Sequence, residues 1–331
     1  MQRFNWGVIG PGNIANTFAK AIAGSKKGKI LAVASRSVER ASEFADTYNI
    51  QKTYSDYGQM LADPEIDIIY IATPHNFHYQ QAKMCLEAGK HVLVEKPCTV
   101  NAQQMKVLVE LAQSKKLLLQ EALWSRFMPC LLQLRQLLDE GIIGEVQYIQ
   151  SEIGFAFQRR DKARMIKAEL AGGALLDLGV YSITVSQFLL QEHPDNVTAM
   201  GQLTEQQVDG HVFANMRYPS GRFAQFTCSM LAQSSNTMRI VGSEGYVNLP
   251  SCFWDTDKAE IFKDNQLLQT IDIPHSVNGF EYQIEASMDS IQKGLFCSDV
   301  MSHADSVGVL RVMDDIRKQL GVQFPQQIEA L

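Results

Sequence analysis

A glycine-containing turn between an apolar run and an amphipathic stretch constrains the fold of this chain most strongly. Trp6–Ile9 has the pattern of a buried strand, Gly10-Pro11-Gly12-Asn13-Ile14-Ala15 follows directly, and Ile14–Ala23 has helical apolar spacing. In such a GxGxxA turn the first glycine permits a tight bend, the second lets the backbone approach a pyrophosphate, and the small third residue allows close helix–strand packing. Free N–H groups at the helix start favour phosphate. The alternative is a glycine-rich turn without a ligand. The residues expected to contact a dinucleotide here are Gly10, Gly12, Asn13 and Ile14.

The pattern that surrounds this turn predicts an α/β fold. Apolar runs of strand length alternate with amphipathic stretches through residues 1–122, and such alternation is typical of a parallel, doubly wound sheet. The expected strands are Trp6–Ile9, Ile30–Ala34, Ile68–Ala72, His91–Val94 and Leu117–Gln120. The expected helices are Ile14–Ala23, Val38–Tyr48, Tyr57–Ala62, Phe77–Ala88 and Ala102–Ser114. We therefore expect residues 1–122 to form a Rossmann domain.

Beyond residue 122 the pattern changes to that of an α+β domain, residues 123–331. Between Val197 and Ile273 apolar and polar residues alternate between turn residues, which indicates an open, mostly antiparallel sheet with one buried face. The other expected elements are a strand at Val146–Phe155 and helices at Pro129–Asp139, Ala174–Leu190, Phe280–Lys293 and Asp305–Leu320. The uncovered face of such a sheet is a surface for self-association, so we expect a homodimer or homotetramer.

The residues after the second expected strand bear on the choice of nucleotide. A site selective for NAD usually has an acidic residue there, whereas this chain has Ser35-Arg36, with Arg40 one turn later. A hydroxyl and a guanidinium suit a 2′-phosphate, because arginine forms bidentate, charge-assisted hydrogen bonds with phosphate oxygens. NADP(H) is therefore favoured over NAD(H), and a solvated arginine at a helix start is the alternative.

Composition argues against several classes of partner. The 331 residues are 46% hydrophobic and 20% charged with a net charge of −6, so neither a nucleic acid nor an anionic membrane is expected. The apolar runs considered, such as Ile68–Thr73, are strand-length, and no signal peptide is expected before Gly7. The six cysteines are scattered without a CxxC, which favours reduced thiols and a cytoplasmic location.

Further motifs connect the chain to a known family. Ala72-Thr73-Pro74-His75-Asn76-Phe77-His78 and Glu95-Lys96-Pro97 follow two expected strands, and Gly172-Gly173 opens a segment that continues as ALLDLGVY. Together with the first glycines, they resemble the Gfo/Idh/MocA oxidoreductase family along essentially the whole chain. The EKP, GGALLDLGVY and Glu121–Phe127 segments are most similar to the branch that contains dimeric dihydrodiol dehydrogenase; glucose-fructose oxidoreductase is a relative.

The resemblance implies roles for individual residues. Lys96 would lie beside the nicotinamide and the substrate, and Asp177 and Tyr181 would reach the same place from the second domain. Arg164 would reach the cofactor, although Ala163 and Ala168 stand where the family commonly has Trp and Pro. The remaining residues expected beside the cofactor are Thr73, Pro74, His75, His78 and Glu95. His75 and His78 lack an accompanying carboxylate or thiol cluster, so no metal is expected.

These residue types predict chemistry at a substrate oxygen. The nicotinamide carries the hydride, so the protein must orient the substrate and handle a proton. We expect Tyr181 to carry that proton, with its pKa lowered by Lys96, and Asp177 to fix substrate hydroxyls or orient Lys96. Each also has an ordinary structural role as its alternative. The expected substrate-binding residues are Lys96, Trp124, Arg126, Phe155, Asp177 and Tyr181, although Trp124 and Phe127 could instead be hinge packing.

The function expected from these features is hydride transfer between NAD(P)(H) and a small carbonyl or alcohol such as a sugar, polyol or trans-dihydrodiol. Two alternatives are a redox-assisted glycosidase and a catalytically silent nucleotide-binding regulatory protein of the same fold. The presence of both Lys96 and Tyr181 argues against the silent protein, because a sensor would need neither.

Overall fold

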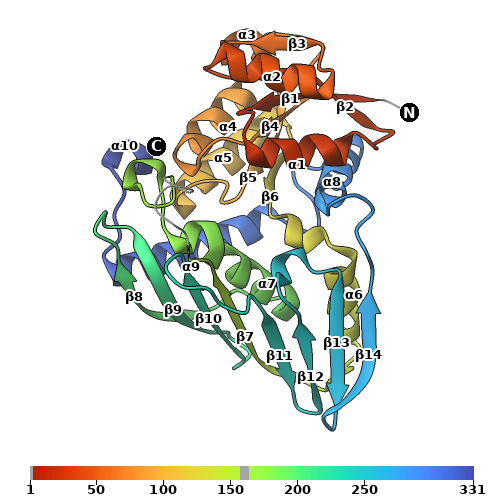
Figure 1. Cartoon of the computed structure of the whole chain (residues 1–331), viewed down its shortest axis with the longest axis vertical. Coiled ribbons are helices and arrows are strands. Elements are labelled where there is room, and N and C mark those ends of the chain that lie inside the picture. Colours follow the sequence, from red (N-terminus) through yellow and green to blue (C-terminus); the bar gives the residue numbers. More distant parts are fainter. Residues whose placement is uncertain (1–2, 157–163) are drawn as a thin grey trace.

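The computed structural model, which describes residues 3–156 and 164–331, contains two sheets, and the first is the expected parallel, doubly wound sheet (Figure 1). Its strand order is β3-β2-β1-β4-β5-β6, so the order reverses between β1 and β4. Dinucleotides bind at such a reversal, at the carboxyl ends of the strands. The strands are β1 (Phe4–Ile9), β2 (Gly28–Ala34), β3 (Lys52–Tyr54), β4 (Ile68–Ile71), β5 (His91–Glu95) and β6 (Leu119–Ala122).

The helices of this domain cover both faces of the sheet and begin where capping residues stand. Asn101 caps α5 by accepting a hydrogen bond from the Gln104 N–H at 2.8 Å, and Ser37 caps α2 in the same way. The bounds are α1 (Asn13–Ile22), α2 (Val38–Tyr48), α3 (Tyr57–Leu61), α4 (His78–Glu87) and α5 (Ala102–Lys115). A short 3₁₀ turn, His75–Phe77, precedes α4.

The second sheet has eight strands in the order β14-β13-β12-β11-β7-β10-β9-β8. Its pairs are antiparallel except for β7 with β10, so the expected open, mostly antiparallel sheet is confirmed. The strands are β7 (Val146–Gly154), β8 (Asn196–Leu203), β9 (Asp209–Arg217), β10 (Phe223–Ser229), β11 (Met238–Gly242), β12 (Gly245–Leu249), β13 (Lys258–Lys263) and β14 (Gln266–Asp272).

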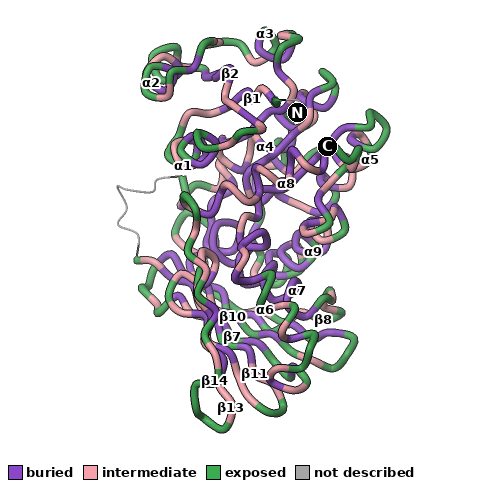
Figure 2. The backbone as a smooth tube through the Cα atoms, turned by 90° about the vertical axis from the view of Figure 1, so that its right-hand side faces the viewer, coloured by how far each residue is buried: buried purple, intermediate pink, exposed green. Residues whose placement is uncertain are grey.

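Helices lie against one face of this second sheet (Figure 1). They are α6 (Pro129–Asp139), α7 (Val180–Leu190) and α9 (His303–Leu320), and a short α10 (Gln326–Glu329) follows. Helix α8 (Phe280–Gln292) instead returns to the Rossmann domain, where Phe280, Ile284 and Met288 join a core with residues of β1 and α1. Figure 2 shows that buried backbone runs through the centre of the molecule and that exposed segments gather at its outer loops.

One helical stretch, Ala168–Leu190, is long and apolar enough to cross a membrane by length and composition, whereas only strand-length apolar runs were expected. In the structure its most apolar window is entirely buried within the protein. Every residue of α7, which ends this stretch, is buried between the second sheet and its neighbouring helices. The stretch is therefore the core helix of the second domain.

Candidate active site

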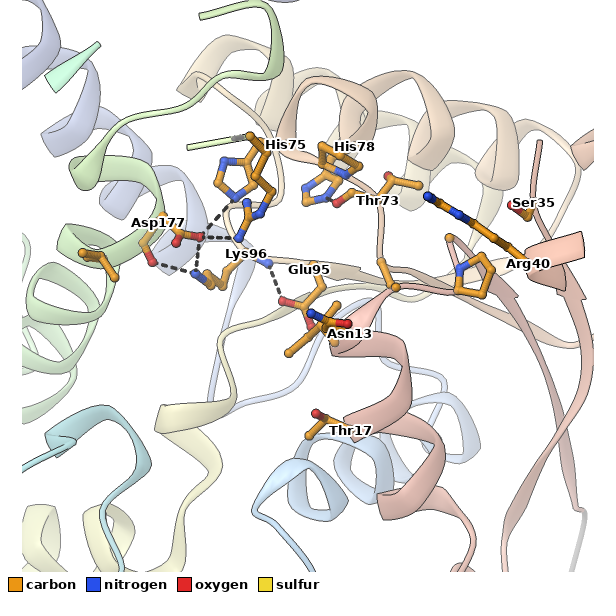
Figure 3. Close-up of a pocket in the computed structure, with 18 of the residues that line it drawn as sticks. Asn13, Thr17, Ser35, Arg40, Thr73, His75, His78, Glu95, Lys96 and Asp177 are labelled. Atoms are coloured by element: carbon orange, nitrogen blue, oxygen red, sulfur yellow. Dashed lines mark hydrogen bonds and ion pairs between the residues drawn. The ribbon is translucent and has the colours of Figure 1, made fainter. Parts of the chain in front are cut away.

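A cavity of about 1070 Å³ extends from the first glycine turn to the second domain (Figure 3). Gly10 has φ +89°, and a Cβ there would come within 2.8 Å of the Thr73 methyl group, so this position requires glycine. At Gly12, by contrast, a Cβ would meet no atom of the described residues within 4 Å and would project into open space. The start of α1 receives no side-chain cap, which leaves its N–H groups available to a phosphate. The turn thus has the shape that a pyrophosphate requires.

The end of the cavity beside β2 is formed by polar and cationic groups. Ser35, Arg36, Ser37 and Arg40 line it, together with Tyr57 from α3. The Arg36 guanidinium lies 5.1 Å from the centre of the Phe77 ring, which holds it at the rim. The Ser37 hydroxyl accepts a hydrogen bond from the Arg40 N–H at 3.3 Å, so α2 begins beside these groups. An anion at this end would meet two guanidinium groups and a helix N-terminus.

The loop after β4 forms the wall between the two ends. The Thr73 hydroxyl donates a hydrogen bond to Gln81 Oε1 at 2.6 Å. Both ring nitrogens of His78 face backbone carbonyl oxygens, Thr73 O at 2.7 Å and Pro97 O at 2.8 Å, so the ring connects the loops after β4 and β5. Burial lowers the pKa of His78, and the two carbonyl acceptors oppose that shift. His75 Nδ1 donates to Ala171 O at 3.2 Å, which connects the same wall to the second domain.

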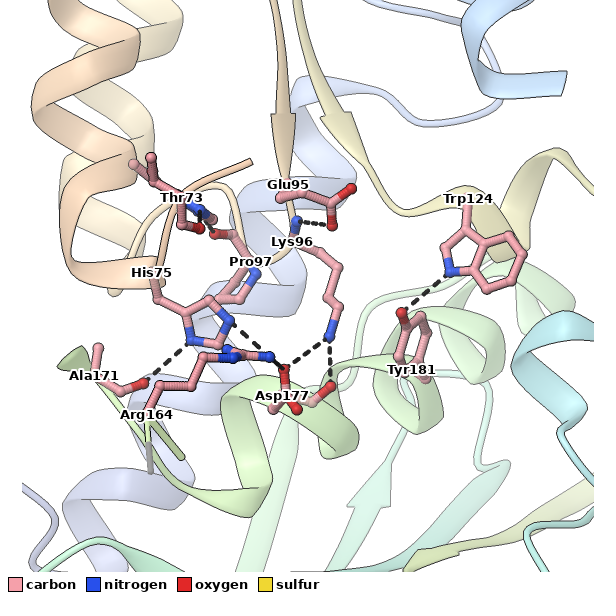
Figure 4. Close-up of polar contacts among 11 residues, drawn as sticks. Thr73, His75, Glu95, Lys96, Pro97, Trp124, Arg164, Ala171, Asp177 and Tyr181 are labelled. Carbon is pink, nitrogen blue, oxygen red and sulfur yellow. Dashed lines mark hydrogen bonds and ion pairs between the residues drawn. The ribbon is translucent and has the colours of Figure 1, made fainter. Parts of the chain in front are cut away.

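The other end of the cavity holds a buried charge cluster around Asp177 (Figure 4). Lys96 Nζ donates to the Asp177 backbone oxygen at 2.6 Å and to its Oδ1 at 3.2 Å, and Arg164 donates to the same Oδ1 at 3.1 Å. His75 Nε2 lies 3.8 Å from that oxygen. The two cations hold the pKa of Asp177 far below its usual range despite its burial, and Asp177 in turn raises the pKa of Lys96 against the effect of burial. The site therefore contains an ammonium ion and a carboxylate at neutral pH.

Aromatic rings cover the side of this cluster that faces the second sheet. The Lys96 ammonium lies 4.7 Å from the centre of the Tyr181 ring, and Trp254 stacks on that ring at 5.9 Å. Phe155 packs edge-on against Trp254 at 5.8 Å. The Tyr181 hydroxyl accepts a hydrogen bond from Trp124 Nε1 at 3.1 Å. Contrary to our expectation of a lowered value, burial raises the pKa of Tyr181, because desolvation outweighs the effect of Lys96.

Asp177 and Tyr181 are presented by an irregular helix start. Leu175–Gly179 forms a wide π turn that continues into α7, so the predicted helix over Ala174–Leu190 does not begin as a regular α-helix. The turn is held from β9, where the buried Asp209 carboxylate accepts a hydrogen bond from the Leu175 N–H at 2.6 Å. Gly173 has φ +122°, and a Cβ there would lie 2.2 Å from Asp209 Oδ1. Asp209 was not predicted as part of the site, because its strand gives no motif.

The structure brings most of the predicted site residues to this cavity, with two exceptions. Trp124, expected to bind substrate, is not among the described residues that line the cavity and instead contacts Tyr181 from behind. Arg126 is also outside that set: it is 4% exposed, forms an ion pair with Asp305 at 3.1 Å and donates to the Met301 sulfur. The predicted residues that line the cavity are Gly10, Gly12, Asn13, Ile14, Ser35, Arg36, Arg40, Thr73, Pro74, His75, His78, Glu95, Lys96, Phe155, Arg164, Asp177 and Tyr181.

Sequence reasoning missed other residues that line the cavity. Trp254 lies in a 3₁₀ turn, Phe253–Asp255, that follows β12. It is about seventy residues beyond Tyr181, and no sequence motif indicates that it lines the cavity. Three other lining residues stand in predicted helices or at their starts: Thr17, Ser37 and Tyr57. Whether one residue of a helix faces a cavity depends on how the helix packs, which the sequence pattern does not show. Ile153 and Leu178 supply apolar lining. Among the described residues, no group of three or more His, Cys, Asp and Glu side chains is arranged to hold a metal ion.

A dinucleotide cradle on a Rossmann sheet, with a buried lysine at its far end, defines the chain as an NAD(P)-dependent oxidoreductase acting on CH–OH groups. Residues 4–123 match the model of an oxidoreductase family with an NAD-binding Rossmann fold, and residues 131–248 match the GFO/IDH/MocA C-terminal domain. The chain belongs to the Gfo/Idh/MocA oxidoreductase family, as the sequence motifs predicted.

Individual relatives and solved structures agree with this assignment. Trans-1,2-dihydrobenzene-1,2-diol dehydrogenase of Xenopus tropicalis is 35% identical over 331 residues, covering 97% of this chain and 99% of the relative. The human protein of the same name is 31% identical, covering 97% and 98%. A 3-ketoreductase from Actinomadura kijaniata in complex with NADP and TDP-benzene superposes with a TM-score of 0.86 at 25% identity, covering 96% and 98%. An aldose-aldose oxidoreductase from Caulobacter crescentus shares the fold, with a TM-score of 0.87 at 21% identity and coverage of 96% and 97%.

Proposed function

We propose that this chain is an NADP(H)-dependent dehydrogenase that interconverts a secondary alcohol and a ketone on a ring carrying a neighbouring hydroxyl, such as a trans-dihydrodiol or a sugar. The observation that carries this proposal is the juxtaposition of Lys96 and Asp177 with the aromatic rings of Phe155, Tyr181 and Trp254 at one end of the cavity. Aromatic rings pack against the apolar face of a ring-shaped substrate, while the charged pair binds hydroxyl groups at its edge. The names of the relatives support a diol substrate.

The contacts of Lys96 and Tyr181 support different functions for the two residues at the substrate oxygen. When bound, the nicotinamide accepts or supplies the hydride. Lys96 Nζ uses two of its three N–H groups on Asp177, so the third can hold the substrate oxygen and stabilise negative charge on it. The Tyr181 oxygen accepts from Trp124, so its own O–H can donate to the same oxygen when a ketone is reduced. Its raised pKa keeps this proton in place at neutral pH until alkoxide charge develops.

The test of this function is the formation or consumption of reduced nucleotide, followed at 340 nm, with a panel of trans-diols, aldoses, anhydro-sugars and polyols. We expect reaction of NADP⁺ with at least one cyclic vicinal diol and a smaller rate with open-chain polyols, which cannot stack as a ring. A chain that binds the nucleotide but turns over none of these compounds in either direction would contradict the proposal.

The preference for NADP(H) is proposed on the basis of Arg36 and Arg40 beside the start of α2. We predict that Arg36→Ala weakens NADPH binding by roughly 10-fold to 100-fold, the loss of one charge-assisted bidentate contact. NADH binding should change by less than about threefold, because NADH lacks the 2′-phosphate. Fluorescence titration with both nucleotides measures this. Arg239→Ala is the matched control, because Arg239 stacks on Tyr246 in the second domain and should leave both affinities unchanged. Tighter binding of NADH than NADPH by the unaltered chain would overturn the preference.

We also propose that the open face of the second sheet mediates a homodimer or homotetramer. The strand register places four large exposed apolar side chains on one face, because Met200 pairs with Phe213 and Phe223 pairs with Tyr148 and Arg217. Phe213 and Phe223 are about half exposed, at 49% and 52%. Exposed aromatic and apolar side chains gathered on one face of a sheet are typical of interfaces.

Sedimentation velocity of a variant carrying Phe213→Glu and Phe223→Glu tests this surface. We expect the unaltered chain to sediment as a dimer or tetramer and the double variant to shift toward the monomer, because a carboxylate buried at an interface costs several kcal/mol. Val38→Glu adds the same charge at an exposed residue of α2 and should leave the assembly intact. A monomeric unaltered chain at micromolar concentration would contradict the proposal.

A further inference from the structure

Two buried carboxylates, Asp177 and Glu95, line the reacting end of the cavity, and they differ in their ion-pair partners. Asp177 is surrounded by Lys96, Arg164 and His75. Glu95 is equally buried at 7% exposure, yet within residues 3–156 and 164–331 it has no ion-pair partner. From the described residues, its oxygens accept hydrogen bonds from the Tyr70 hydroxyl at 2.6 Å and from the Lys96 backbone N–H at 3.3 Å. Figure 4 shows the Glu95 carboxylate at the opposite end of the Lys96 side chain from the ammonium group.

An ionised carboxylate that is buried without a cation beside it destabilises the protein, and either a positive charge nearby or protonation removes that cost. Glu95 ends β5 and lines the cavity. The first half of the sheet, β1 and β2, carries the glycine turn and Arg36, so the other half of a bound dinucleotide would lie over the ends of β4 and β5. That half is the nicotinamide, whose ring is positively charged when oxidised and neutral when reduced. The group that can balance Glu95 is therefore one whose charge changes during the reaction.

We propose that Glu95 is a redox-linked proton site, ionised beside the oxidised nicotinamide and protonated beside the reduced one. The inference rests on the nucleotide site described above and holds for either NADP(H) or NAD(H). During alcohol oxidation the substrate C–H bond breaks, its hydride would cancel the charge of the ring, and Glu95 then takes up one proton from the solvent. The proton of the substrate hydroxyl is accepted by the Tyr181 oxygen, whose own proton has first been released to the solvent, so one proton leaves the site for the one that Glu95 takes up. Ketone reduction reverses each step, and Glu95 releases its proton.

The surroundings of Glu95 set its pKa within the pH range in which the protein can be studied. Burial raises the pKa of Glu95 to about 7. The titratable and charged groups that face it are Tyr70 from β4, Lys96 directly after β5, Tyr181 from α7, and Arg164. The Tyr70 hydrogen bond and the two cations each oppose the effect of burial. A positively charged ring beside Glu95 would favour the ionised carboxylate and so lower this pKa.

The sign of the effect follows from linkage. The oxidised nucleotide favours the ionised carboxylate, so its binding releases a proton and tightens as the pH rises. The reduced nucleotide has no such preference. The ratio of the two dissociation constants, oxidised over reduced, should therefore fall by about tenfold or more as the pH rises to about 7, and level off above it. The ratio is independent of the 2′-phosphate, because that group titrates identically in both nucleotides.

Isothermal titration calorimetry with NADP⁺ and NADPH between pH 5.5 and 8.5 tests the proposal without turnover. Glu95→Gln should make the ratio independent of pH. Tyr70→Phe removes the hydroxyl that lowers the pKa of Glu95, so the levelling point should move to higher pH. Glu121→Gln is the matched control, because Glu121 is a buried carboxylate on the adjacent β6 outside the described cavity lining, and it should retain the wild-type dependence.

Three results would overturn the proposal. A ratio that does not change with pH in the unaltered chain excludes redox linkage while leaving the nucleotide site in place. An unchanged pH dependence in Glu95→Gln, or an unmoved levelling point in Tyr70→Phe, assigns the linkage to another group. Failure of the unaltered chain to bind either nucleotide would instead contradict the cofactor site itself, and with it this inference.

Discussion

Replacing Lys96 by Met is expected to lower kcat by a factor of roughly 10² to 10³ and to change the dissociation constant of NADPH by less than about threefold. Lys96 Nζ is the ammonium that touches Asp177 and lies over the Tyr181 ring, and Figure 3 shows Lys96 and Asp177 at the opposite end of the cavity from Ser35 and Arg40. Its loss removes stabilisation of charge on the substrate oxygen while the nucleotide contacts at Gly10 and Arg36 remain. Steady-state kinetics and fluorescence titration on the same preparation separate the two effects.

Lys90 provides a matched control, because it directly precedes β5 and Lys96 directly follows that strand. Lys90 is also buried, at 8% exposure, and its Nζ donates to the backbone oxygens of Asp63 and Ile66 at the amino end of β5. Lys90→Met should therefore reduce stability but leave kcat within about threefold of the unaltered value. A Lys96→Met variant that folds and turns over as fast as the unaltered chain would show that the reaction does not depend on this ammonium group.

Replacing Gly173 by Ala should both destabilise the protein and lower its activity. The φ of +122° disfavours any side chain, at a cost of about 1–3 kcal/mol, and the new Cβ would lie 2.2 Å from the Asp209 carboxylate. Burial raises the pKa of Asp209 to about 7, so above that pH its carboxylate is a charged acceptor, and displacing it disrupts a hydrogen bond with Leu175 that is worth about 1.5–3 kcal/mol. We expect a loss of at least about 3 kcal/mol in the free energy of unfolding. Urea denaturation measures this loss, and kcat should fall because the π turn that carries Asp177 begins two residues later.

Gly221→Ala separates backbone strain from the collision with Asp209. Gly221 has φ +86°, but a Cβ there would meet no described atom within 4 Å. It should cost only about 1–2 kcal/mol and leave kcat unchanged. Equal losses of stability and activity in the two variants would mean that Asp209 does not hold the helix start in place.

The parallel sheet was predictable because its strands and helices have different periodicities. The short β3, Lys52–Tyr54, was missed because three residues, none of them fully buried, give no hydrophobic pattern, and β6 lies two residues later than expected. The return of α8 to the Rossmann domain could not be predicted, because the spacing of apolar residues in a helix shows which face is buried but not which domain covers it. The complete burial of α7 could not be predicted either, because it depends on how the second sheet and the neighbouring helices pack around it.

Within the site, the prediction of which residues line the cavity agrees with the structure where those residues belong to a fixed local motif, and their chemical roles stay predictions. The glycine turn, Lys96 and Asp177 each occupy a place that the motif defines. It failed where a contact depends on distant segments: Asp209 reaches Leu175 across thirty-four positions, and Arg126 pairs with Asp305 rather than lining the cavity. The pKa of Tyr181 was predicted with the wrong sign because the sequence reveals a cation nearby but not the extent of burial.

The structure of the chain crystallised with NADP⁺ tests the central claim most directly, because it shows whether the cavity is one nucleotide site with a reacting end. The account predicts the pyrophosphate at Gly12, the 2′-phosphate within hydrogen-bonding distance of Arg36 or Ser35, and the nicotinamide C4 facing the space beside Lys96 and Tyr181. A nucleotide bound elsewhere, or one whose nicotinamide C4 faces away from Lys96, would contradict it.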